Sequence, residues 1–192
     1  MKIILPIIFI FILSSSGLKA NNSLDLLTLY KQLHSYPELS FKEEKTSKKL
    51  ASMLIDLGFE VTENFAGYGV VALLENGEGK TVMIRADMDG LPVRELTGSS
   101  YASKTKSFNQ VGDEVFTMHA CGHDIHMTSL MGTAINLMKR KDEWRGNLII
   151  LFQPAEEVGS GARNIIKAGI FEKFPRPDFN LALHASEDLP AG

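Results

Sequence analysis

The potential ligands of a metal ion are concentrated in one short segment of the chain, residues 119–126 (HACGHDIH). This segment holds three of the five histidines and the only cysteine. Thiolate, imidazole and carboxylate groups together form the ligand set of zinc and similar transition metals. Gly122 lets the backbone bend tightly, so that Cys121 and His123 can face one ion. The segment therefore predicts a metal or catalytic site, and the alternative is a helix start that happens to be polar.

A pair of carboxylates forms a second candidate, where Glu156 and Glu157 come shortly after the apolar run 148–152. Catalytic groups in α/β sheets gather at the carboxyl ends of strands. Adjacent residues that leave a strand point in different directions. One glutamate can therefore bind a metal while the other stays free as a general base, as metal-assisted hydrolysis requires. Without the neighbouring Cys/His segment, such a pair is more often a solvated surface.

Two further strand ends carry polar side chains. His184 ends the predicted strand 179–183, and its place at a strand end, like that of the glutamate pair, favours a ligand over a structural histidine. Asp87 and Asp89 follow the predicted strand 81–86 and can orient a ligating histidine. The alternative for these two aspartates is a turn rich in Asp, Gly and Pro.

The sequence does not single out one role for each of the remaining histidines. His119 and His126 are candidates for substrate contacts or for groups that orient a ligand, with structural hydrogen bonding as the alternative. His34 lies on a predicted helix near Pro37 and receives no role.

The elements that must position these residues alternate between helices and strands. Apolar spacing and turn residues predict helices at 24–33, 41–57, 129–139 and 161–168, and strands at 69–74, 81–86, 148–152 and 179–183. Such alternation predicts an α/β layered domain. Ser40 and Glu43 have the spacing of a capping box at the start of the second helix. The polar stretch 97–112 is interpreted as a loop or a hairpin insertion.

Composition and charge exclude several other classes of protein. Apolar residues make up 44% of the chain and charged residues 22%, which is typical of a folded protein and excludes a disordered tail or a collagen. The net charge of −3 gives no electrostatic footprint for nucleic acid. A single cysteine excludes an intramolecular disulfide framework.

The first 20 residues have the pattern of a signal peptide. Lys2 precedes an unbroken apolar run at 3–13, which is too short to span a bilayer, and small and polar residues follow up to Ala20. We expect cleavage after Ala20, no stable membrane span thereafter, and export to a periplasm or the outside; the alternative is an uncleaved N-terminal anchor. In an oxidising compartment a lone thiol needs something to hold it, so export favours a metal or a partner thiol at Cys121 over a small buried apolar residue.

Taken together, the motifs resemble the M20 peptidase family in its amidohydrolase branch, which includes hippurate hydrolases, N-acyl-amino-acid amidohydrolases and auxin-conjugate hydrolases. The segments that match in order are 33–41 (LHSYPELSF), 84–92 (IRADMDGLP), 119–126, 152–157 (FQPAEE) and 183–184 (LH). The resemblance covers residues 24–192. It implies the layered α/β catalytic domain of a di-metal, zinc-peptidase-like hydrolase.

The resemblance also implies a role for each site residue. Cys121, His123, Glu157 and His184 would bind two divalent ions, commonly manganese, zinc, nickel or cobalt, with Cys121 in the bridging position. Glu156 would be the general base, which takes a proton from a metal-bound water that attacks an amide carbonyl and then protonates the leaving amine. The implied substrate is a small N-acyl amino acid. The alternatives are a carboxypeptidase or dipeptidase of the wider family, or an inactive metal-binding fragment of such an enzyme.

The resemblance finally suggests how the domains are organised. In the family, a smaller lid domain used for homodimerisation interrupts the catalytic domain, which then resumes and supplies a last histidine ligand. Because the sequence stops at Gly192, where that insertion would begin, we expect 21–192 to be the N-terminal part of the catalytic domain, with the lid absent. We expect this part to fold poorly alone and to be weakly active or inactive.

Overall fold

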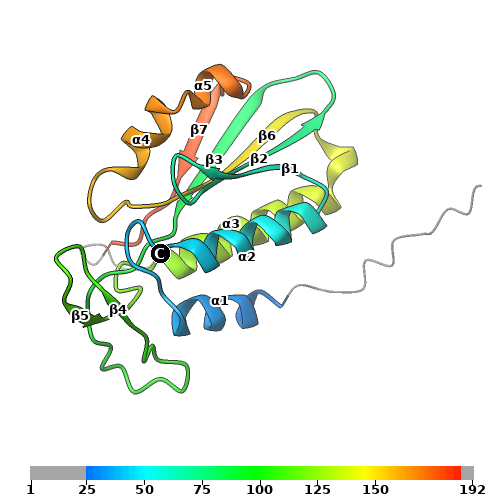
Figure 1. Cartoon of the computed structure of the whole chain (residues 1–192). Coiled ribbons are helices and arrows are strands. Elements are labelled where there is room, and N and C mark those ends of the chain that lie inside the picture. Colours follow the sequence, from blue (N-terminus) through cyan, green and yellow to red (C-terminus); the bar gives the residue numbers. More distant parts are fainter. Residues whose placement is uncertain (1–24, 187–192) are drawn as a thin grey trace, which may run out of the picture.

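The computed structural model describes residues 25–186, so the predicted signal peptide at 1–20 and the chain end at 187–192 lie outside the described residues. The core of the fold is a five-stranded mixed sheet in the order β1-β2-β6-β3-β7 (Figure 1). Its strands are β1 (Glu60–Phe65), β2 (Gly69–Asn76), β3 (Thr81–Asp87), β6 (Gly146–Gln153) and β7 (Phe179–Ala182). Strands β3, β6 and β7 run parallel, whereas β1 and β2 are antiparallel to their neighbours.

Helices cover both faces of the sheet, as Figure 1 shows. One face packs against α1 (Leu26–Ser35), α2 (Glu44–Asp56) and α3 (His123–Lys139), and the other against α4 (Gly161–Lys167) and α5 (Ile170–Lys173). Alternate residues of the central strands serve the two faces: in β6, Ile150 and Phe152 join the larger apolar core, whereas Ile149 and Leu151 join the smaller one. The predicted α/β layered fold is confirmed.

The remaining elements lie outside these layers. A short 3₁₀ helix at Lys141–Glu143 leads into β6. Strands β4 (Lys106–Phe108) and β5 (Glu114–Phe116) pair only with each other. The stretch predicted as a loop or a hairpin insertion at 97–112 thus contains the first strand of a hairpin, which extends to residue 116. Among residues 25–186, no helix is both long enough and apolar enough to cross a membrane.

The structure differs from the prediction at two polar segments. Strand β1 was not predicted, because its sequence EVTENF is polar and mostly exposed, as suits a strand at the edge of the sheet. Helix α3 begins at His123 rather than at residue 129, because the polar residues of its first turn are buried against other polar groups instead of facing solvent.

The predicted capping box at α2 is wrong. The side chain of Glu38 satisfies the free N–H groups of this helix, since its carboxylate accepts hydrogen bonds from the backbone of Lys45 (3.2 Å) and Thr46 (2.8 Å). Ser40 and Glu43 turn away from the helix and bond to Asp89 and to the backbone of Ala155 instead. Both residues therefore support a polar site rather than a helix end.

Candidate metal centre

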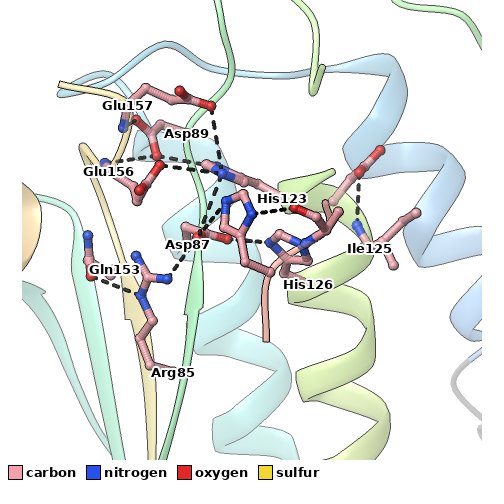
Figure 2. A network of polar contacts seen from close by, with 12 residues as sticks. Arg85, Asp87, Asp89, His123, Ile125, His126, Gln153, Glu156 and Glu157 are labelled. Carbon is pink, nitrogen blue, oxygen red and sulfur yellow. Dashed lines mark hydrogen bonds and ion pairs between the residues drawn. The ribbon is translucent and has the colours of Figure 1, made fainter. Parts of the chain in front are cut away.

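The candidate polar residues gather at the carboxyl ends of the parallel strands β3, β6 and β7 (Figure 2). Asp87 is the last residue of β3, Glu156 and Glu157 follow β6, and His184 follows β7. The first turn of α3 brings His123 to the same place. The structure thus brings the candidate residues of these separate segments together.

Gly122 makes the abrupt entry into α3 possible. Its φ of 78° lies in the left-handed region, and an added Cβ would come within 3.3 Å of Ala185. This bend starts α3 at His123, whose side chain is buried.

His123 lies at the centre of the site, surrounded by carboxylates. Its Nε2 atom is 3.6 Å from Asp87, 3.7 Å from Glu156 and 3.7 Å from Glu157, and its Nδ1 atom is 3.5 Å from Asp89. Both ring nitrogens are buried and neither has a hydrogen-bond partner. Burial lowers the pKa of His123, but the surrounding carboxylates outweigh burial and raise it.

Asp87 is held in place from two sides. One carboxylate oxygen accepts a hydrogen bond from Arg85 (2.9 Å), and the other contacts Nδ1 of His126 (2.6 Å). Burial alone would raise the pKa of Asp87, but His126, His123 and Arg85 together lower it, so the buried carboxylate stays ionised. The second ring nitrogen of His126 accepts the N–H of Ala185 at 2.9 Å. His126 therefore orients Asp87 through one ring nitrogen and holds the backbone of Ala185 through the other.

Asp89 fixes the loop that carries the glutamate pair. Its two oxygens accept the backbone N–H groups of Glu156 and Glu157, each at 3.0 Å, and one of them also accepts the hydroxyl of Ser40 at 2.6 Å. Burial raises the pKa of Asp89, but His123 and then these hydrogen bonds outweigh burial and lower it. The sequence allowed an orienting role for Asp89, and the structure shows that it positions backbone as well as facing His123.

A second buried carboxylate, Glu43, completes this support. Its Oε1 atom accepts the N–H of Ala155 at 2.8 Å, and Ala155 has the left-handed φ of 52° that non-glycine residues rarely adopt. Burial, and the nearby Asp89 to a smaller extent, raise the pKa of Glu43 to about 7. Sequence reasoning placed Glu43 at a helix cap, so its place beneath the glutamate loop was missed.

The two glutamates differ in exposure. The side chain of Glu157 is 16% exposed and its Oε1 atom is buried without a partner, whereas the side chain of Glu156 is 33% exposed. Cys121 lies beside both of them, and burial followed by these carboxylates raises the pKa of its thiol to about 11. At neutral pH this thiol is protonated, and a cation beside it would favour the thiolate.

His184 closes the site from the side of β7. Its ring lies 5.4 Å from the ring of His123 and 4.8 Å from that of His126, and its Nε2 atom is 3.8 Å from Asp87. Its other nitrogen, Nδ1, contacts the carbonyl oxygen of Ala185 at 2.7 Å. A histidine that donates through one nitrogen offers the other as a metal ligand.

His119 is buried beside His123, and neither of its nitrogens has a hydrogen-bond partner. Burial lowers the pKa of His119 to about 4, so this ring is neutral at neutral pH. The rings of His119 and His123 are 6.5 Å apart. His119 thus lies near the central histidine but is not among the residues whose ligand atoms converge.

A further buried network was missed by the sequence reasoning. His34 contacts Asp124 at 2.6 Å through Nδ1 and Glu95 at 3.0 Å through Nε2. Asp124 directly follows His123 in α3, so this network anchors the same helical turn that presents the central histidine. The only signal was the similarity of residues 33–41 to a family motif, which named no partner for His34.

The donor set fits a divalent metal ion. Ligand atoms of Asp87, His123, His126 and His184 lie within 4.8 Å of one another, and so do those of His123, Glu156 and Glu157. The unpartnered nitrogens of His123 and the unpartnered oxygen of Glu157 are buried polar atoms that a cation would satisfy. Of the four predicted ligands, His123 belongs to both groups, His184 to the first and Glu157 to the second, whereas Cys121 belongs to neither.

Comparisons with known proteins agree with this site. Residues 83–192 match the model of peptidase family M20/M25/M40. A thermostable carboxypeptidase 1 from Saccharolobus solfataricus is 41% identical over 87% of this chain and 40% of its own length. An N-acetylcysteine deacetylase from Bacillus subtilis is 38% identical over 87% of this chain and 41% of its own length.

A solved structure of the same family is also similar to this chain. A dinuclear metal-binding M20 peptidase from Bacillus subtilis superposes with a TM-score of 0.74 at 37% identity, over 86% of this chain and 43% of that one. The chain thus spans about two-fifths of the length of the curated relatives it matches. The family model covers more than half of the chain, including every residue of the carboxylate-ringed histidine site, and the chain belongs to peptidase family M20/M25/M40.

Proposed function

We propose that this chain carries the metal-binding half-site of a hydrolase that cleaves the amide bond of N-acyl amino acids. One observation carries the proposal: a buried imidazole without hydrogen-bond partners is surrounded by four carboxylates. Such an arrangement is costly unless a cation joins it, because like charges repel at these distances. The relatives named as N-acetylcysteine deacetylases support an N-acyl amino acid as the substrate.

We assign the holding of two divalent ions to His123, Glu157, His184 and Cys121. A bound divalent ion lowers the pKa of water toward neutrality and polarises a carbonyl. Glu157 suits a ligand because its Oε1 atom is buried and unpartnered. Cys121 would lose its proton only on binding a cation, which couples its thiolate to occupancy of the site.

We assign proton transfer to Glu156. Its carboxylate is more exposed than that of Glu157, so it is open to water and substrate, and Asp89 fixes its backbone. In this role Glu156 takes the proton of the attacking water and later returns it to the leaving amine, as a general base and then a general acid.

A carboxypeptidase is the second candidate function, because a relative of that name is 41% identical to this chain. The test uses manganese-loaded chain with two sets of substrates, N-acetyl and N-benzoyl amino acids on one side and dipeptides on the other. The proposal predicts faster hydrolysis of the acyl amino acids. Preferential cleavage of dipeptides would favour the carboxypeptidase.

The matched variant is Glu156→Gln, which keeps size and hydrogen bonding but removes the base. We expect turnover to fall by about 10²–10⁴-fold, which is the typical contribution of a general base, while bound metal stays unchanged. Loss of metal with turnover would make Glu156 a ligand, and full turnover would refute its role as the base.

A further inference from the structure

An apolar cavity of about 370 Å³ adjoins the candidate metal centre. Its walls are Leu39, Ser40 and Lys42, the turn 90–92, the hairpin residues 108–111 and the pair Glu157–Val158. The hairpin β4–β5 stands apart from the main sheet in Figure 1, and its residues form one side of this space. We call this space the hairpin cavity.

Several apolar side chains of the hairpin cavity face solvent. Phe108 is 58% exposed, Val111 82% and Val158 43%, whereas Leu39 on the opposite wall is buried. Exposed apolar side chains that cluster beside a polar site often form a binding surface. Covering these side chains with an apolar group would remove their contact with water.

We propose that the hairpin cavity binds the acyl group of the substrate and selects bulky apolar acyl groups over acetyl. This inference rests on the proposed function, because it assigns one half of an N-acyl amino acid. Glu157 belongs both to the cavity wall and to the candidate metal centre, so a group in the cavity lies beside the bond to be cleaved. The volume is ample for a ring or a chain of several carbons.

Charge favours the acyl half over the amino acid half. The α-carboxylate of an amino acid needs a cationic partner, and Lys42 is the only Lys or Arg among the residues that line the cavity. Its Nζ atom donates to the carbonyl oxygen of Phe108 at 2.5 Å, which ties the hairpin to the segment before α2. Lys42 thus builds the wall, and an uncharged group suits the space that it borders.

Binding and turnover are tested separately. The Glu156→Gln variant lacks the proposed general base, so it should not consume the substrate during the titration. Its zinc-loaded form is titrated calorimetrically with N-benzoylglycine and with N-acetylglycine. We expect the benzoyl compound to bind about tenfold more tightly, as expected for a few extra apolar carbons in a pocket. Replacing Phe108 and Val111 together by Ser is expected to abolish this preference, with circular dichroism as the check on folding.

Leu96→Ser is the matched control, because Leu96 is an equally exposed apolar residue that does not line the hairpin cavity. It should keep the tenfold preference. Equal affinity for the two compounds, or a preference that survives the Phe108 and Val111 double variant, would overturn the proposal. If the double variant is monomeric where the unmodified chain is dimeric, and the benzoyl preference is unchanged, the exposed side chains would bind a second copy of this chain. That result would also overturn the proposal.

The two proposals fail in different ways. A benzoyl preference that depends on Phe108, together with faster hydrolysis of dipeptides than of acyl amino acids, would leave the hairpin cavity standing and refute the proposed function. Turnover at equal efficiency for both acyl groups would support hydrolysis and refute the assignment of the cavity.

Discussion

Two buried histidines of this protein, His34 and His123, both lie among carboxylates but differ in how their nitrogens are used. Both nitrogens of His34 are bonded, to Asp124 at 2.6 Å and to Glu95 at 3.0 Å. The carboxylates around His123 stay at 3.5 Å or more, and neither of its nitrogens has a hydrogen-bond partner. The first network is closed and holds the fold, whereas the second is open and suits an added cation.

The two networks meet in one turn of α3, since His123 and Asp124 are consecutive residues. The closed network fixes Asp124, and the fixed turn presents His123 to the carboxyl ends of the strands. This arrangement separates stability from binding: changes to His34 should cost folding free energy, and changes to His123 should cost metal affinity.

Replacing His123 by Ala tests the open network and should have the largest effect. A structural zinc site gains about 10–16 kcal/mol from roughly four ligands, so the loss of one should weaken binding by roughly 10³-fold, or about 4 kcal/mol. Calorimetric titration with zinc measures this affinity. Metal affinity unchanged in the variant would contradict the central place of His123.

Replacing His34 by Leu tests the closed network. We expect the free energy of unfolding to fall by about 3 kcal/mol, because Asp124 and Glu95 are left as buried charges without a counter-ion. Urea denaturation measures the loss. Lys48→Ala is the matched control, since it breaks an ion pair of similar length at the surface and should change stability little.

The pH dependence of the His34 variant has a definite sign. Burial lowers the pKa of His34, but its bonds to Glu95 and Asp124 outweigh burial and raise it above its ordinary value. The stabilisation is therefore complete below the ordinary histidine pKa of about 6.5 and is lost as pH rises through the raised value. The free energy of unfolding of the unmodified chain should therefore exceed that of the variant by the largest amount at about pH 6. A larger difference at pH 9 would contradict this account.

Replacing Glu43 by Gln gives the smallest of these effects. The pKa of Glu43 is raised to about 7, so the folded chain binds its proton more tightly than the unfolded chain does. Stability from this group is complete below about pH 4.5 and falls by about 2 kcal/mol between pH 4.5 and pH 6.5. Urea denaturation of the metal-free chain should show a flatter pH profile for the variant, and parallel profiles would refute the raised pKa.

The sequence predicted the site better at strand ends than at helix ends. Asp87, the glutamate pair and His184 follow apolar runs, so their convergence follows from the parallel order of the strands. The roles of Ser40, Glu43 and His34 depend on partners 49 to 112 residues away, which no local pattern encodes. Local spacing even favoured a capping box for Ser40 and Glu43, and long-range hydrogen bonds overrode it.

The metal content of the purified chain tests the central claim most directly. The chain is loaded with manganese or zinc, desalted and analysed for metal per chain, beside His123→Ala and His34→Leu variants. The proposed centre predicts about two ions per chain, loss of bound metal in His123→Ala, and retention in folded His34→Leu. A folded chain that retains no metal after loading would contradict the claim that the carboxylates around His123 form a metal centre.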